Sequence, residues 1–294
     1  AEFWAEATDV PELTAEDLGR LRSLSAELRV VPSPQAEFSA NHSFWRWQAF
    51  FSPRFGQNAM AAARLKAYSL KPVVLTLSSC DLCLFLDADN APLRPPQDLL
   101  PMLQKNSALF WPDLWPAPRG GLWSSFASMQ TQESGQVMVR KTSQVRRALL
   151  LASLLAVRAD IFVEAIYGLG DGKLMCGFGD KDVYQMSFLM LGVPYHMMAS
   201  LPGVLTMRGA FAGLVQSDQT GRSLFAHGSH AKDQLWQLLQ ADGLQRCDFR
   251  EKQAAANLSC VAERGSGLQA IAMEALECEA LHFPSQAQLR LLLR

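Results

Sequence analysis

Two aspartates follow an apolar run directly in the segment LCLFLDADN. Asp87 and Asp89 are spaced i and i+2, and the apolar residues before them are typical of a buried strand. In an open α/β sheet, ligands bind beyond the carboxyl ends of the strands. Two carboxylates at that place can hold a hard divalent cation that bridges a diphosphate. Aspartates are common at strand ends and turns, but an apolar strand that leads straight into the pair favours a metal site.

Two chemistries use an apolar strand followed by this pair of aspartates. In sugar transfer from a nucleotide sugar, a metal neutralises the nucleoside diphosphate as its bond to the sugar breaks. In aspartyl-nucleophile phosphatases the first aspartate attacks phosphorus, and that motif has a glycine and a threonine or valine directly after the second aspartate. Here Asn90, Ala91 and Pro92 follow. The sequence therefore argues against the phosphatase and favours the transferase.

Composition excludes several other classes. The chain has 294 residues, of which 49% are hydrophobic and 19% charged, enough apolar material for a globular core. Its 27 lysines and arginines balance 28 acidic residues, so the net charge of −1 draws it to neither nucleic acid nor an anionic membrane. The apolar run at 148–157 is about half the ~20 residues that a membrane span needs. It predicts a buried helix.

The elements that must position the aspartates alternate between strands and helices, which predicts one α/β domain over residues 1–240. Residues 241–294 carry no motif and are expected to form a helical extension of unknown role. The strands are expected at 1–7, 29–33, 73–86, 108–111 and 134–140. Helices are expected at 59–70 and 143–157, and a proline-rich loop followed by a helix within 91–105.

Cys80 and Cys83 form a CxxC inside the apolar run that leads to the aspartates. In that setting two buried strand thiols are favoured over a redox pair.

Six segments, in this order along the chain, resemble the fungal Golgi α-mannosyltransferases of glycosyltransferase family 71. The resemblance covers roughly residues 60–235 and implies a GT-A fold, a Rossmann-like mixed sheet flanked by helices. It also implies retaining, metal-dependent transfer from a nucleotide sugar, GDP-mannose in the fungal members, onto a glycan acceptor by a type II membrane protein of the Golgi. The segments are RLKAYSL (64–70), LFLDADNAPL (84–93), ALFWPDLW (108–115), QESGQVMVRK (132–141), FGDKDVY (178–184) and LFAHGSHAK (224–232).

The resemblance assigns a metal centre to three residues. Asp87 and Asp89 would bind the metal and the diphosphate, and His227 resembles the late histidine that supplies a third metal ligand in related retaining enzymes. His230 competes with His227 for that role. A neutral imidazole beside two carboxylates suits Mn²⁺ better than Mg²⁺.

The same resemblance suggests two cations at the donor. Lys66 would lie near the nucleotide or the sugar, although a solvated helix residue is an equally good interpretation. Lys232, five residues after His227, would reach the diphosphate.

Two further aspartates, Asp180 and Asp182, lie at the head of the segment DVYQMSFLML, which is expected to be a helix. A carboxylate there can cap the helix N-terminus. In a transferase, one of the two would face the acceptor hydroxyl or stabilise the oxocarbenium-like transition state. Asp182 is the first candidate and Asp180 the second.

Short polar and aromatic side chains are expected to form the sugar pocket, because a hydroxyl-rich ligand needs several hydrogen-bonding groups around an apolar floor. Glu133, Ser134 and Gln136 offer the polar groups, unless they are only polar residues at a strand edge. Trp111 and Asp113 would form the wall along the apolar face of a pyranose, and core packing is the other interpretation of the tryptophan.

The N-terminus departs from the family pattern, because the chain opens at what resembles the second strand of the fold. We therefore expect an incomplete pocket for the nucleotide base, and a membrane anchor that is not in this chain. Two alternatives to a mannosyltransferase stay open: a glycogenin-like or galactosyltransferase-like enzyme that uses a UDP-sugar, and a non-catalytic module that binds a glycan or a nucleotide.

Overall fold

A computed structural model gives the arrangement of the chain. The residues that it describes are 2–7, 27–32, 71–87, 89–114, 129–157, 181–207, 210–228, 244–249 and 276–280.

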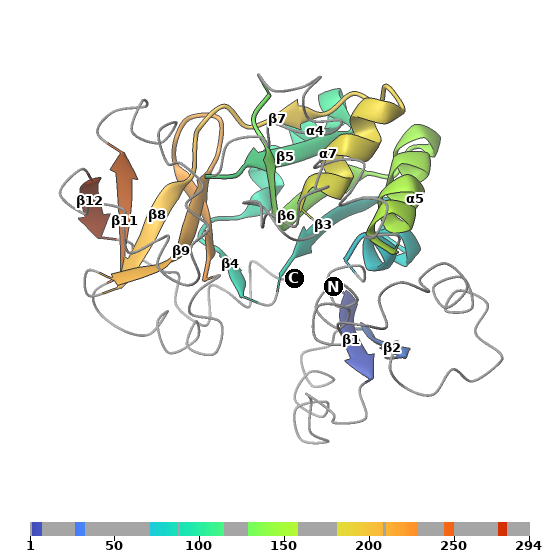
Figure 1. Cartoon of the computed structure of the whole chain (residues 1–294), viewed down its shortest axis with the longest axis horizontal. Helices are drawn as coiled ribbons and strands as arrows, with labels where there is room; N and C mark the ends of the chain where they lie inside the picture. The colour runs from blue at the N-terminus through green and yellow to red at the C-terminus, as the bar shows by residue number, and fades with distance from the viewer. Residues whose placement is uncertain are drawn as a thin grey trace, which may run out of the picture.

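A four-stranded mixed sheet forms the centre of the structure (Figure 1). Its order is β3 (Leu82–Leu86), β6 (Gln132–Arg140), β5 (Ala108–Pro112) and β7 (His196–Met197). β6 is antiparallel to both of its neighbours, whereas β5 and β7 are parallel. β3 and β5 therefore run in the same direction, and their carboxyl ends lie at one edge of the sheet. The chain is a mixed α/β protein, as expected.

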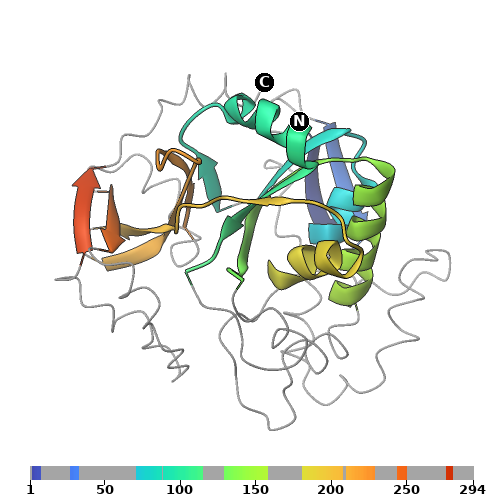
Figure 2. The same ribbon diagram turned by 90° about the horizontal axis from the view of Figure 1, so that it is seen from above.

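Helices lie against both faces of this sheet (Figure 2). α5 (Ser143–Val157) and α7 (Lys181–Met190) pack together, and α7 also packs against β6. On the opposite face the short η2 (Pro96–Leu99) leads into α4 (Leu100–Asn106), which packs against β5 and β6. The apolar run at 148–157 is thus the C-terminal part of α5. The prediction of a helix is confirmed, but only one face of it is buried: Ala148 and Ala152 are fully buried, whereas Leu150 is 63% exposed.

Alternation along β6 builds a core on each face of the sheet. Val137 and Val139 belong to the cluster that includes residues of α5 and α7, while Met138 belongs to the cluster with Leu103 of α4. Successive side chains of a strand point to opposite faces, so a single apolar strand supplies both clusters.

A second sheet is antiparallel throughout. It has six strands, and two of them come from the segment 241–294, for which we expected helices; the rest of that segment lies outside the described residues. The order of the strands is β12 (Leu276–Ala280), β11 (Leu244–Phe249), β8 (Gly203–Met207), β9 (Ala210–Ser217), β10 (Ser223–His227) and β4 (Asn90–Pro92).

The two sheets are joined through Trp111 of β5. Its ring is fully buried and packs edge-to-face on Phe225 of β10, with the centroids 5.3 Å apart. Its indole Nε1 donates a hydrogen bond of 3.0 Å to the carbonyl oxygen of Ser217. Gln216 Nε2 donates another of 3.0 Å to the carbonyl oxygen of Pro112. Buried hydrogen bonds have a strict geometry, so they fix how the end of β9, and β10 paired with it, lies relative to the four-stranded sheet.

Near the N-terminus, the strands expected at 1–7 and 29–33 are found as β1 (Glu2–Ala7) and β2 (Glu27–Pro32), which pair in parallel. The helix expected at 59–70 lies outside the described residues. No helix in the described part of the chain is long and apolar enough to cross a membrane.

The strand expected over 73–86 is wrong in its first part, because residues 71–77 are helical and only Leu82–Leu86 form β3. Packing and capping outweigh the strand preference of Val73, Val74 and Thr76. Val73 and Val74 are buried, and Thr76 Oγ1 donates a hydrogen bond of 2.7 Å to the carbonyl oxygen of Pro72. At the end of this helix the buried Lys141 Nζ donates 2.6 Å to the carbonyl oxygen of Ser78.

β3 also differs from the expectation of a strand buried on both faces, because β6 is its only neighbour among the described strands and its pairing is antiparallel. Four of its five residues are at least partly exposed. The prediction of two buried thiols is corrected as well, since Cys80 and Cys83 are joined by a disulfide just where the chain enters β3. Cys80 lies two residues before β3 begins, and the bend of the chain between Cys80 and Cys83 brings the two sulfurs together.

Candidate metal centre

The chain passes from one sheet to the other at the two aspartates. β3 ends at Leu86, Asp87 follows, and β4 begins at Asn90 in the six-stranded sheet. Backbone hydrogen bonds fix this crossing: Asp87 N donates 2.9 Å to the carbonyl oxygen of Gly135, and Asn90 N donates 3.0 Å to that of Asp87. The crossing places both carboxylates at the carboxyl end of β3, as the sequence predicted.

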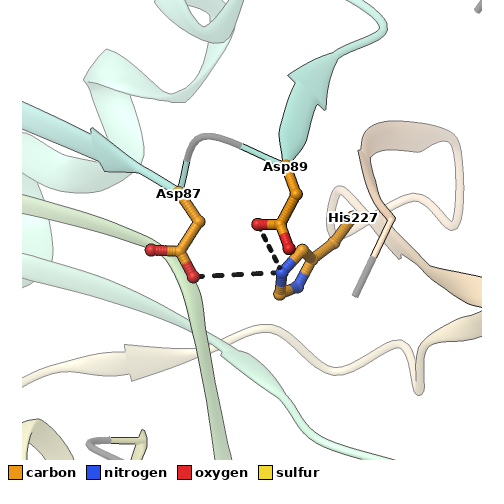
Figure 3. Close-up of side chains that lie close together, drawn as sticks. All are labelled: Asp87, Asp89 and His227. Atoms are coloured by element: carbon orange, nitrogen blue, oxygen red, sulfur yellow. Dashed lines mark hydrogen bonds and ion pairs between the residues drawn. The ribbon is translucent and has the colours of Figure 1, made fainter. Parts of the chain in front are cut away.

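His227 reaches the aspartates because β4 pairs with β10. His227 is the last residue of β10 and lies opposite Asn90 in the antiparallel register. Its Nε2 lies 3.2 Å from Asp89 Oδ1 and 3.9 Å from Asp87 Oδ2 (Figure 3). One ligand atom from each of the three side chains lies within 4.8 Å of the others. The group of Asp87, Asp89 and His227 could therefore hold one metal ion.

An irregularity in β6 brings a third carboxylate to this group. Between the pairs Leu109 with Met138 and Trp111 with Glu133, β5 advances by two residues and β6 by five. Such bulges redirect side chains, and here Glu133 Oε1 comes to lie 3.2 Å from His227 Nδ1. The two groups form an ion pair when the imidazole is protonated.

Two glycines make the room for His227. A Cβ at Gly135 would lie 2.5 Å from both Cε1 and Nδ1 of the imidazole. A Cβ at Gly213 of β9 would overlap the backbone carbonyl oxygen of His227. Any side chain at either position would therefore push His227 away, so the observed position of His227 requires glycine at both.

The charges around His227 perturb its titration and that of Glu133. Burial by itself lowers the pKa of His227, but the carboxylates of Glu133 and Asp89 outweigh it and raise the pKa to about 10. Burial raises the pKa of Glu133, yet the charge of His227 and the hydrogen bond from Gly135 N outweigh it, so the net shift is downward. Glu133 is therefore ionised, and a metal ion at His227 would have to take the place of a proton.

The donor set fits a divalent cation. With a neutral imidazole, the carboxylates of Asp87, Asp89 and Glu133 together with the ammonium of Lys71 carry a net charge of −2. The side chains of Asp89, Glu133 and His227 are buried, and buried charge of one sign requires compensation. Two carboxylates and an imidazole are ligands of the kind that first-row divalent metals accept.

Lys71 is a residue of the site that the sequence did not single out. Its Nζ forms an ion pair of 2.7 Å with Asp87 Oδ2 from the helical residues 71–77. We expected a cation from the preceding segment, at Lys66, but Lys66 lies outside the described residues. The signal in the sequence was only a lysine near a helix end, which is common on any protein surface.

Several other predicted residues lie outside the described part of the chain. They are Lys66, Asp180, His230 and Lys232, and their roles stay predictions.

The residues predicted for the sugar wall follow or belong to β5. Trp111 belongs to the core between the sheets, where no part of its ring is exposed. Asp113 comes directly after β5, at the same edge as Asp87, and its Oδ1 accepts a hydrogen bond of 2.7 Å from Leu114 N. Both side chains are buried in this structure, and their contact with a sugar stays a prediction.

The remaining predicted residues are also buried. Ser134 and Gln136 lie in β6, and Gln136 Oε1 accepts a hydrogen bond of 2.6 Å from Asn90 Nδ2. Asp182 lies in the first turn of α7 and is fully buried. α7 lies beside the start of β6, since Gln185 N donates a hydrogen bond of 3.0 Å to Gln132 Oε1. Its role toward an acceptor stays a prediction.

Comparison with known proteins agrees with a transferase. No family model matches the chain. Over 214 residues it is 23% identical to the protein named alpha-1,2-mannosyltransferase MNN22 of Candida albicans. The match covers 56% of this chain but 36% of that protein, so the chain spans about a third of its relative's length. The chain is a distant homologue of a mannosyltransferase, which suggests a glycosyltransferase.

Proposed function

We propose that this chain is the catalytic part of a metal-dependent glycosyltransferase with a GT-A fold, related to glycosyltransferase family 71. The observation that carries the proposal is the convergence of Asp87, Asp89 and His227 from two sheets in a distant homologue of a mannosyltransferase. The donor would be a nucleotide sugar, with GDP-mannose first among the candidates, and the acceptor a glycan in the Golgi lumen. Mn²⁺ is the cation that we propose.

The site residues would act on the leaving group and not on the sugar itself. A divalent cation held by Asp87, Asp89 and His227 would supply positive charge where the nucleoside diphosphate leaves. Lys71, 2.7 Å from Asp87 Oδ2, is a second positive group available to a phosphate. Because Asp89 and His227 are buried, the attraction between these charges is stronger than it would be in water.

We further propose that transfer retains the configuration at the sugar. Asp182, and Asp180 before it, are the candidates for the carboxylate that faces the acceptor hydroxyl. Trp111, Asp113, Glu133, Ser134 and Gln136 are the predicted surroundings of the sugar, with Lys66 and Lys232 as further cations at the donor.

A donor panel tests the proposal. GDP-mannose and a set of UDP-sugars would be added to the purified chain with and without Mn²⁺, and transfer to a mannose oligosaccharide and hydrolysis of the donor would be measured. We expect turnover of one donor only with Mn²⁺, reduced about 100-fold or more in Asp89→Asn. The matched control is Asp98→Asn, an exposed carboxylate in η2, which should leave turnover unchanged.

Each other result has a definite meaning. Turnover of a UDP-sugar would replace GDP-mannose as the donor and keep the transferase. Mn²⁺-dependent binding of a donor with neither transfer nor hydrolysis would mean that the chain is a binding module. Turnover that does not depend on the metal would contradict the proposal.

A further inference from the structure

The two ring nitrogens of His227 face different carboxylates. Nε2 points to the aspartates, 3.2 Å from Asp89 Oδ1, while Nδ1 lies 3.2 Å from Glu133 Oε1. A histidine that binds a metal through one nitrogen usually presents the N–H of the other to a carboxylate, a carbonyl or a water. That partner determines which nitrogen carries the proton and how the ring is turned.

Glu133 is itself held rigidly. Its Oε1 accepts a hydrogen bond of 2.8 Å from Gly135 N, and its Oε2 accepts one of 2.7 Å from Gln136 Nε2. Gln136 Oε1 in turn accepts 2.6 Å from Asn90 Nδ2. A chain of contacts therefore runs from His227 through Glu133 and Gln136 to Asn90, the residue next to Asp89. The position of the histidine is coupled to the position of the aspartate loop.

Burial restricts the conformations that these four side chains can adopt. Glu133 and Asn90 are each 8% exposed, His227 is 7% exposed, and Gln136 is fully buried. In such surroundings a polar group that loses its partner is costly, so each member restricts the conformations of the next. The irregularity in β6 is what aims Glu133 at the ring, since Glu133 and Gln136 would otherwise point to opposite faces of the strand.

We propose that Glu133 is a positioning residue of the metal centre, whose carboxylate holds the imidazole of His227 with Nε2 directed at Asp87 and Asp89. The inference rests on the proposed function, because it concerns the same site. It gives Glu133 a role other than contact with the sugar, for which the sequence suggested it. In this role the Glu133 carboxylate acts by contacting Nδ1 of His227. A general effect of its negative charge would not require that contact.

Two substitutions separate reach from charge. Glu133→Asp keeps the charge but withdraws the carboxylate by one methylene group, so that it no longer meets Nδ1. Glu133→Gln keeps the length and an acceptor oxygen but removes the charge. Mn²⁺ alone would be titrated into the whole chain by calorimetry, with Asp98→Asn as the control for loss of an exposed carboxylate outside the group of Asp87, Asp89 and His227.

Positioning predicts that Glu133→Asp weakens Mn²⁺ binding about 10- to 100-fold, and that Glu133→Gln weakens it less. Crystal structures of both proteins without added metal should show that the imidazole of His227 is turned in Glu133→Asp relative to the wild type, with Nε2 farther from Asp89 Oδ1. This readout does not depend on activity, and it also shows whether the variant is folded.

The reverse order of affinities, with Glu133→Asp close to the wild type and Glu133→Gln the weaker binder, would overturn the inference, because charge alone would then explain the effect. Failure of the wild type to bind Mn²⁺ would overturn it too. If the variants behave as predicted but no donor is turned over, the proposed function fails and the positioning role of Glu133 stands.

Discussion

Replacing Gly135 by alanine tests how the site is built with the smallest possible change. The added Cβ would lie 2.5 Å from Cε1 and Nδ1 of His227 and 3.1 Å from Glu133 Oε1. Carbon atoms in ordinary contact are about 3.5–4.0 Å apart. One group must therefore move by about 1 Å.

The imidazole is the group that moves. The backbone of Gly135 is held in place, because its carbonyl oxygen accepts hydrogen bonds from Asp87 N and Asn90 Nδ2. A metal site tolerates errors of only about 0.5 Å in ligand position, so a displacement of about 1 Å removes His227 as a ligand. We expect Gly135→Ala to weaken Mn²⁺ binding at least about tenfold, or by about 1.4 kcal/mol, and to lower the free energy of unfolding by about 1–3 kcal/mol through overpacking.

Gly192→Ala is the matched control for the loss of stability. Gly192 has φ +62°, and nothing lies within 4 Å of a Cβ there, so alanine would cost about 1–2 kcal/mol of backbone strain without touching the site. Mn²⁺ affinity by calorimetry and the free energy of unfolding in urea would be measured for both variants. If Gly135→Ala binds Mn²⁺ as the wild type does, or if Gly192→Ala loses the same affinity, the steric argument is refuted.

Two further predictions concern charges. Because the Lys71 ammonium competes with a cation for Asp87 Oδ2, 2.7 Å away, Lys71→Met should bind Mn²⁺ about fivefold more tightly, a gain of about 1 kcal/mol; weaker binding in the same titration would mean that Lys71 holds Asp87 in place. Asp218 lies in the turn between β9 and β10. Burial raises its pKa, but hydrogen bonds from Thr220 and Arg222 outweigh this effect and lower the pKa below 3.8. The carboxylate therefore stabilises the fold fully above pH 3.8, and this stabilisation is lost as the pH falls through the lowered pKa. Asp218→Asn should therefore cost about 2 kcal/mol at pH 7 and progressively less below about pH 4; urea unfolding of both proteins from pH 7 to pH 3 checks this, and a constant difference across that range would contradict it.

Local patterns in the sequence predicted the elements that carry the aspartates. The helix over 143–157, the strand at 108–111 and the carboxylate pair after β3 follow from apolar periodicity and from the abrupt end of an apolar run. The error over 73–77 arose because β-branched residues favour strands only when packing allows it. The helix there is stabilised by the buried Lys141, which hydrogen-bonds to its end from 63 residues away along the chain.

Contacts between distant segments could not be predicted from local sequence patterns. Nothing near Lys71 or Asn90 in the sequence indicates that one meets Asp87 and the other Gln136. The sequence does not mark Gly135 as part of the site, because a glycine in a strand has many explanations. Its role depends on His227, which lies 92 residues away and reaches Gly135 only through the pairing of β4 with β10.

The sequence by itself determined the kinds of ligand that this protein can offer and the strand end at which two of them lie, because side-chain chemistry and apolar patterning are local properties. It also carried the resemblance that brought His227 into consideration. Only the tertiary structure decided that His227 faces Asp89 through one nitrogen and Glu133 through the other. The physical reason is that the orientation of a buried imidazole depends on strand register, on the irregularity in β6 and on the space left by two glycines, and all of these arise where distant segments pack together.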